Sequence, residues 1–193
     1  KGQQLPNIYE QLEVVLKKEH EALWEASKKI ESSVHLVKEV LHSQRQHAKG
    51  GTLWDDLSLA ALLDQQILKQ LITFPDHLQL VTDYQTSTKV RAQKSKLIHV
   101  LVNLLKNAKE SLEEAQPPEP TIWVRVLQKS EKEVAIDIQD NGVGVSALQL
   151  TNLFTHGFTT KSTGNGFGLH SCANYMGEMH GRIEVDSPGV GQG

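Results

Sequence analysis

The feature that most constrains the fold is a long N-terminal stretch without glycine or proline, from Asn7 to Lys49. This stretch carries apolar residues at spacings that alternate around three, four and seven, namely Ile8, Leu12, Val15, Leu23, Ala26, Ile30, Val34, Val37 and Leu41. The periodicity predicts a helix of about 40 residues, or roughly 60 Å. A lone helix of that length cannot bury its apolar stripe, so we predict a homodimer through residues 7–48. One long helix folded back on a following domain is the alternative.

The helical pattern ends at the segment HAKGG, where Gly50 and Gly51 supply a stop and a hinge. A chain of 193 residues can hold one ordinary domain with an appendage. We therefore expect residues 1–50 to form a long helix that is part of a dimerisation region, and residues 51–193 to form one domain with its own core.

Helix and strand signals alternate after the hinge, which favours an α/β fold. Helical patterns cover about 58–71, 94–114, 147–154 and 168–180, and extended or alternating patterns cover 52–57, 78–84, 182–187 and segments that begin at Thr121 and Glu133. The last two read as adjacent antiparallel strands. We expect an α/β sandwich in which helices cover one face of a mixed sheet.

Composition excludes several classes of function. Twenty basic and 23 acidic side chains give a net charge of -3, which provides no basic stripe for nucleic acid and none for an anionic membrane surface. The single cysteine, Cys172, cannot form an internal disulfide, and no apolar run of about 18 residues exists. We expect a cytoplasmic location for this part of the protein, while any membrane anchor would lie outside it.

The first segment that could carry chemistry is LVNLLKNAKESL, in which Asn103 and Asn107 are four residues apart and share one helix face. An amide oxygen there could bind magnesium, which prefers oxygen ligands and keeps several waters. Two surface or capping asparagines are the simpler interpretation of this segment alone.

The second segment, DIQDNGVGV, places Asp140 at a strand end before Gly142 and Gly144. A carboxylate there can accept a hydrogen bond from an exocyclic amine while the backbone approaches a flat ring. An ordinary strand-to-turn exit is equally compatible with the pattern.

The third segment, FTHGFTTKSTGNGFGLHSC, places Gly164, Gly166 and Gly168 before a helix and after a loop that contains Lys161. Backbone amides and the positive helix end could close on phosphate oxygens, and the lysine could reach the outermost phosphate. The dinucleotide fingerprint does not fit, because the glycines come late in the chain, and the Walker phosphate loop is absent.

Taken in order, the asparagine helix, the Asp-x-Gly-x-Gly turn, the phenylalanine-containing loop and the glycine run resemble the N box, first glycine box, F box and second glycine box of the GHKL superfamily. The resemblance extends from about residue 52 to the end, and sensor histidine kinases match best, through NLLKNAKESL and GFTTKSTGNGFGLHS. The segment ESSVHLVKEVLHSQRQHAK also resembles the second helix of their dimerisation domain. The resemblance implies a GHKL (Bergerat) sandwich that binds ATP and Mg2+, works as a homodimer and passes a phosphoryl group toward a response regulator receiver domain.

The resemblance also implies roles for individual residues. Asn103 and Asn107 would line the Mg-ATP site, Asn107 would hold the metal, Asp140 would bind the adenine amine, and Lys161 would act with the asparagines in catalysis. The whole predicted ATP-binding set is Asn103, Lys106, Asn107, Glu110, Asp140, Gly142, Gly144, Phe158, Thr159, Thr160, Lys161, Gly164, Gly166, Phe167, Gly168 and Leu169.

One position separates a kinase from a hydrolase. GHKL hydrolases such as DNA gyrase typically carry a glutamate four residues before the magnesium asparagine, as general base for water, and here that residue is Asn103. An amide cannot take a proton, so the position suits transfer of the γ-phosphoryl group to another acceptor. Glu110 could be proposed as a substitute base, although a magnesium-shell or surface carboxylate is the simpler role.

The chain departs from a complete kinase in two ways. His20-Glu21 comes closest to a phosphoacceptor box, but Trp24 stands where the family has asparagine or threonine, so we expect the acceptor histidine to lie outside this chain. The sequence also stops where the family usually adds one more strand. A GHKL-type hydrolase or ATP-gated dimer, and a nucleotide-binding regulatory module without catalysis, are the alternative functions.

Overall fold

The computed structural model describes residues 16–20, 23–24, 26–27, 53–71, 77–159 and 166–192. The chain divides into two compact units, and Thr52–Thr159 with Gly166–Gly193 form the larger one. In the other unit, the described residues 16–20, 23–24 and 26–27 are helical. The rest of the predicted helix over 7–48 lies outside the described residues, so the dimerisation helix and the domain division stay predictions.

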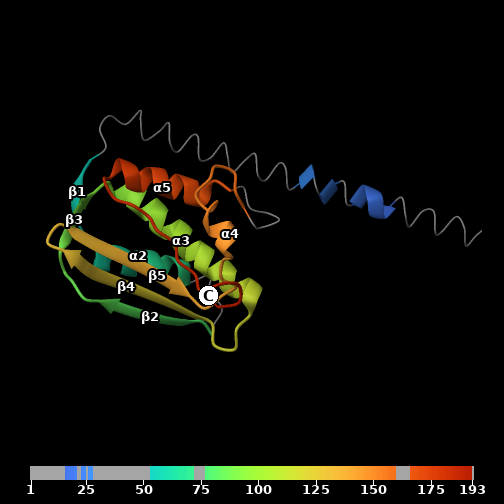
Figure 1. The fold of residues 1–193 in the computed structure, drawn as a ribbon, viewed down its shortest axis with the longest axis horizontal. Coiled ribbons are helices and arrows are strands. Elements are labelled where there is room, and N and C mark those ends of the chain that lie inside the picture. Colours follow the sequence, from blue (N-terminus) through green and yellow to red (C-terminus); the bar gives the residue numbers. More distant parts are fainter. Residues whose placement is uncertain are drawn as a thin grey trace, which may run out of the picture. The chain divides into compact units, whose positions relative to one another are not determined.

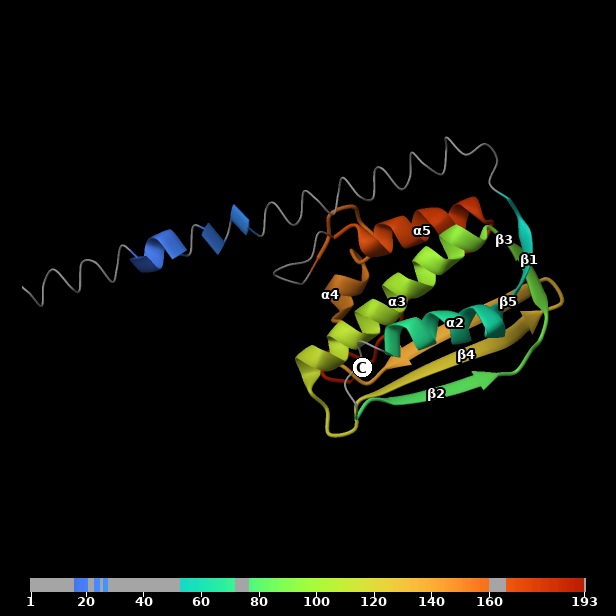
Figure 2. The ribbon, with the colours of Figure 1, turned by 180° about the vertical axis from the view of Figure 1, so that it is seen from behind.

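In its described residues, the larger unit is an α/β sandwich built from nine elements. Their order is β1 (Asp55–Ser58), α2 (Leu59–Leu71), β2 (Gln79–Tyr84), β3 (Lys89–Ala92), α3 (Lys94–Ala115), β4 (Thr121–Ser130), β5 (Glu133–Asp140), α4 (Ala147–Leu150) and α5 (Gly168–Glu178). Helices α2, α3 and α5 lie on one side of the sheet (Figures 1 and 2).

The three-stranded sheet has the order β2-β4-β5 and is mixed, as the sequence predicts. Strand β2 runs parallel to β4, with Gln79 opposite Thr121, and β5 runs antiparallel to β4, with Ile122 opposite Asp140. A parallel pair needs a crossover connection, and α3 lies within the segment that joins β2 to β4. A second, two-stranded sheet pairs β1 with β3, and the sequence analysis did not identify β3.

Strand β4 shows why the helices gather on one face of the sheet. Its side chains alternate, so that Ile122, Val124 and Val126 are fully buried. Helix α3 supplies the matching apolar face, since its buried residues recur every three or four positions and include Leu101 and Leu105. Full burial of one leucine is worth about 1.5–3 kcal/mol, so this contact holds α3 firmly against the sheet.

Specific hydrogen bonds fix the end of α3 and the loop that leads from it into β4. Gln116 ends α3 in a left-handed conformation, with φ of 47°, and its amide donates to Leu112 O at 2.8 Å. Asn141, directly after β5, accepts from Thr121 N at 2.8 Å and donates to Glu119 O at 2.9 Å. The two Asn141 bonds hold the carboxyl end of β5 against the start of β4.

The predicted strand at 182–187 is wrong, because the structure assigns no strand there. Side chains attach this segment to its surroundings: Arg182 pairs with Glu133 at 2.7 Å, and Ser187 Oγ accepts from Val145 N at 3.0 Å. A strand needs a backbone ladder, and in the described part of the chain no strand pairs with these residues. The helix predicted for 147–154 is also shorter and ends at Leu150.

None of the helices in the described ranges combines the length and the apolar character that crossing a lipid bilayer requires.

Candidate nucleotide site

The carboxylate of Asp140, the last residue of β5, is held by two hydrogen bonds to the same oxygen. Ser111 Oγ on α3 donates to Oδ1 at 2.8 Å, and Gly142 N donates to Oδ1 at 2.9 Å. Asp140 is half-buried. Since the described donors both reach Oδ1, the lone pairs of Oδ2 remain for a hydrogen bond from a ligand.

Gly142 is buried against Ser111, and the position admits no side chain. A Cβ at residue 142 would lie 2.1 Å from Ser111 Oγ and 2.6 Å from the Ser111 carbonyl carbon. Gly144 has a φ of 65°, which favours glycine. The two glycines of the Asp-x-Gly-x-Gly turn are therefore required by the close approach of the turn to α3 and by its backbone conformation.

The two asparagines lie on the side of α3 that faces this region, and both are half-buried. Asn103 Nδ2 donates to His99 O, one turn earlier, at 3.0 Å. Its Oδ1 lies against the first residue of α5, because a Cβ at Gly168 would be 3.1 Å from that oxygen. Gly168 thus lets the N-terminus of α5 pack directly on the Asn103 amide.

Lys106 and Glu110 form an i,i+4 pair on α3, with Nζ and Oε1 3.6 Å apart. The Lys106 side chain is 61% exposed, whereas that of Glu110 is 31% exposed. The ammonium partner and the partial exposure favour the role of a surface carboxylate for Glu110 over that of a general base.

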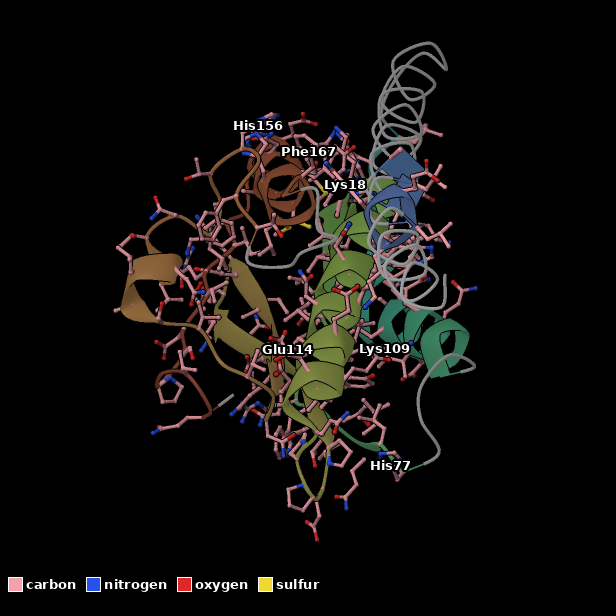
Figure 3. The ribbon with its side chains drawn as sticks, turned by 90° about the vertical axis from the view of Figure 1, so that its right-hand side faces the viewer. Lys18, His77, Lys109, Glu114, His156 and Phe167 are labelled. Carbon is pink, nitrogen blue, oxygen red and sulfur yellow. The ribbon has the colours of Figure 1, made fainter. Side chains whose placement is uncertain are left out.

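The glycine-rich segment is described at its two ends. Gly157 N donates to Gly166 O at 3.2 Å, and a Cβ at Gly166 would lie 2.3 Å from Gly157 C. His156 packs edge-on against Phe167, with ring centroids 4.8 Å apart (Figure 3). It also packs edge-on against His170, with ring centroids 5.1 Å apart. Thr160, Lys161 and Gly164 lie outside the described residues, so their roles stay predictions.

The remaining predicted residues flank the same segment. Phe158 is half-buried and Thr159 is exposed, and Phe167 and Leu169, at the start of α5, are half-buried. The structure thus groups Asn103, Gly168 and the α5 N-terminus at one place on α3, and Asp140 with Gly142 further along the same helix. Asn107 lies between these places on the helix face.

The sequence analysis missed Ser111, which contacts both Asp140 and the backbone of Val143. The signal was present, since Ser111 follows Asn107 by four residues and Asn103 by eight, and these spacings place all three on one helix face. It also missed the ring cluster of His156 and His170, whose side chains meet only through the fold.

Asparagine oxygens fit magnesium, which binds oxygen ligands and retains waters. Among the described residues, no group of three or more histidine, cysteine, aspartate or glutamate side chains could hold a metal ion.

Comparisons of the sequence with protein families and with individual proteins both lead to histidine kinases and related ATPases. The family described as histidine kinase-, DNA gyrase B-, and HSP90-like ATPase matches residues 92–193. The signal transduction histidine-protein kinase AtoS of Escherichia coli is 28% identical over 168 residues, covering 85% of this chain. The sensory histidine kinase/phosphatase NtrB of Rhizobium leguminosarum is 33% identical over 126 residues, covering 59% of this chain. This chain spans 26% of AtoS and 33% of NtrB.

Solved structures share the fold. The mycobacterial sensor histidine kinase MprB aligns with a TM-score of 0.61 at 20% identity, over 69% of this chain and 85% of that one. A nucleotide-free catalytic domain of the histidine kinase ThkA aligns with a TM-score of 0.60 at 21% identity, over 72% of this chain and 91% of that one. The relatives named above are sensor histidine kinases. The family match covers more than half of the sequence, and the chain therefore belongs to the histidine kinase-, DNA gyrase B-, and HSP90-like ATPases.

Proposed function

We propose that this domain binds Mg-ATP and transfers the γ-phosphoryl group to a histidine that lies outside this chain, for relay to a response regulator receiver domain. The observation that carries the proposal is the Asp140 carboxylate, fixed through Oδ1 beside the asparagine-bearing face of α3. Its second oxygen would accept the hydrogen bond of the adenine amine.

The triphosphate would extend from this point toward Asn103 and the start of α5. Gly168 packs on Asn103 Oδ1, so the positive N-terminal end of α5 lies beside the amide-bearing face of α3. Asn107 would contribute an oxygen to magnesium, which neutralises phosphate charge when bound. Lys161 would reach the outermost phosphate, as the sequence pattern suggests.

Asn103 supports a kinase over a hydrolase. Its amide nitrogen is engaged with His99 O, and an amide cannot act as general base toward water. Phosphoryl transfer depends chiefly on positioning and charge neutralisation, which the groups around Asn103 can provide. The neighbouring carboxylate, Glu110, is paired with Lys106.

Dimerisation through the N-terminal helix belongs to the same proposal. Leu16 and Leu23 lie seven residues apart in helical residues and are 55% and 71% exposed. In the continuous helix that the sequence predicts, two apolar side chains at that spacing would share one helix face, as in a coiled-coil seam. The sensor-kinase relatives support the receiver-domain partner.

The test uses γ-labelled ATP, magnesium and acceptor-helix domains from sensor kinases such as AtoS and NtrB. We expect label on an acceptor histidine, recognised by its acid lability, and the same labelling with Glu110→Gln. Steady ATP hydrolysis that the acceptor does not alter, and that Glu110→Gln abolishes, would contradict the proposal and establish the hydrolase.

A further inference from the structure

The hydroxyl of Ser111 bridges helix α3 and the turn that follows β5. It donates to Asp140 Oδ1 at 2.8 Å, and its oxygen accepts from Val143 N at 3.1 Å. A backbone N–H can only donate, and an ionised carboxylate can only accept. The single hydroxyl hydrogen must therefore point at Asp140, so the direction of both bonds is fixed.

These bonds determine how the Asp140 carboxylate is turned. The terminal torsion of aspartate is broad and roughly two-fold, so a carboxylate held by one donor can rotate and exchange its oxygens. Here Ser111 and Gly142 N converge on Oδ1 from two different elements. Without the serine hydroxyl, one backbone donor would remain on Oδ1, and Val143 N would lose its acceptor.

We propose that Ser111 is a positioning residue for recognition of the purine base, an inference that rests on the proposed nucleotide-binding function. By holding Oδ1, it presents Oδ2 to the hydrogen-bond donor at C6 of adenine. Guanine carries a carbonyl oxygen at that carbon, and two acceptors that face each other repel. Ser111 thereby sharpens the preference for adenine over guanine.

The size of Ser111 suits this role. The turn approaches so closely that a Cβ at Gly142 would lie 2.1 Å from Ser111 Oγ. A larger side chain at 111 would push the turn away, whereas alanine would fit but would supply no hydrogen bond. Because serine is half-buried here, its bonds are partly shielded from competing water.

The test compares two ligands that differ only in the amine. A non-hydrolysable ATP analogue and the corresponding triphosphate of purine riboside, which has hydrogen at C6, are titrated into the wild type and Ser111→Ala. Because the hydrogen bond between Asp140 and the adenine amine should be weakened or lost, Ser111→Ala should weaken binding of the ATP analogue by about three- to tenfold. Binding of the amine-free analogue by Ser111→Ala should stay unchanged, so that the variant loses the preference for the ligand that carries the amine.

Ser130→Ala is the matched control, because Ser130 Oγ accepts from Lys132 N at 3.3 Å in the exposed β4–β5 turn, at the opposite end of this strand pair from Asp140. Ser130→Ala should bind the ATP analogue and the amine-free analogue as tightly as the wild type does. Equal weakening of both ligands by Ser111→Ala would show a merely structural role, and unchanged binding of both would remove the role altogether; either result overturns the inference. A wild type that binds neither ligand would instead overturn the proposed function on which the inference rests.

Discussion

Ser111 on α3 and Gly142 in the turn after β5 lie so close together that residue 142 has no room for a side chain: a Cβ at 142 would lie 2.1 Å from Ser111 Oγ. The contact includes the backbone of the helix, since the same Cβ would be 2.6 Å from the Ser111 carbonyl carbon. A flexible side chain could move aside, but a helix packed on the sheet through Leu105 and Leu112 cannot.

Gly142→Ala should therefore destabilise the domain and weaken nucleotide binding. Overpacking of this kind costs about 1–3 kcal/mol. The control is Gly177→Ala in α5, where a Cβ meets nothing within 4 Å, and alanine in a helix should raise stability by up to about 1 kcal/mol. Urea unfolding of both variants checks the prediction, and equal stabilities would contradict it.

Lys96 and Glu178 join the start of α3 to the end of α5. The Lys96 side chain is 10% exposed, pairs with Glu178 and lies 5.8 Å from the centre of the Tyr175 ring. Glu178→Gln leaves the ammonium buried with a neutral partner, so we expect it to cost about 1–2 kcal/mol, a value moderated because the Glu178 side chain is 54% exposed.

Lys96→Met removes the buried charge and keeps the apolar stem, so this variant should be more stable than Glu178→Gln. Thermal unfolding of the two variants at one salt concentration shows which of them is more stable. The reverse order would show that burial of the ammonium beside a neutral partner costs little.

Ionisation of Tyr84 should make the folded domain less stable at alkaline pH. Burial raises the pKa of the Tyr84 hydroxyl, and the Asp64 carboxylate that accepts its hydrogen bond at 2.8 Å raises this pKa further. Below about pH 10, the usual pKa of tyrosine, the Tyr84 hydroxyl keeps its proton in both the folded and the unfolded chain, and its hydrogen bond contributes fully to the stability of the fold. Above that pH the unfolded chain loses a proton that the folded chain retains, so stability falls as pH rises.

Tyr84→Phe should flatten this decline, and Asp64→Asn should flatten it in part, because burial remains. Urea midpoints measured between about pH 8 and 11 give the slopes. Parallel curves for the wild type and Tyr84→Phe would show that other groups cause the decline.

The N-terminal helix should hold the chain as a dimer in solution. The double variant Leu16→Glu with Leu23→Glu places negative charge on the proposed seam, so we expect sedimentation equilibrium to show that this variant is a monomer. Leu148→Glu is the matched control, because Leu148 is an exposed leucine on α4, with an exposed fraction of 78%, outside the proposed seam. A double variant that remains dimeric would contradict dimerisation through this face.

Much of the fold could be predicted because its signals are local. The spacing of Leu97, Leu101, Leu105 and Leu112 predicted α3, and alternation around Ile122 and Val124 predicted β4. Strand β3 was missed because it has four residues, only one of them buried, and forms through pairing with β1. The strand expected at 182–187 has suitable alternation, but a ladder depends on a partner strand that local sequence cannot supply.

The candidate site was predictable to a similar extent. Asp140, Gly142 and Gly168 stand out through their order and spacing, and the structure explains each glycine by a close approach. Ser111 was missed because a serine in a helix has many possible roles, and its bond to Asp140 joins residues 29 positions apart. Contacts of this kind depend on how α3 packs against β5.

Titration calorimetry with a non-hydrolysable ATP analogue, with and without magnesium, tests the central claim most directly. The account predicts that the wild type binds, that Asp140→Ala weakens binding by about ten- to a hundredfold through loss of a charge-assisted hydrogen bond, and that Asn107→Ala loses the enhancement by magnesium. A folded wild type that binds no adenine nucleotide at any magnesium concentration would contradict the account.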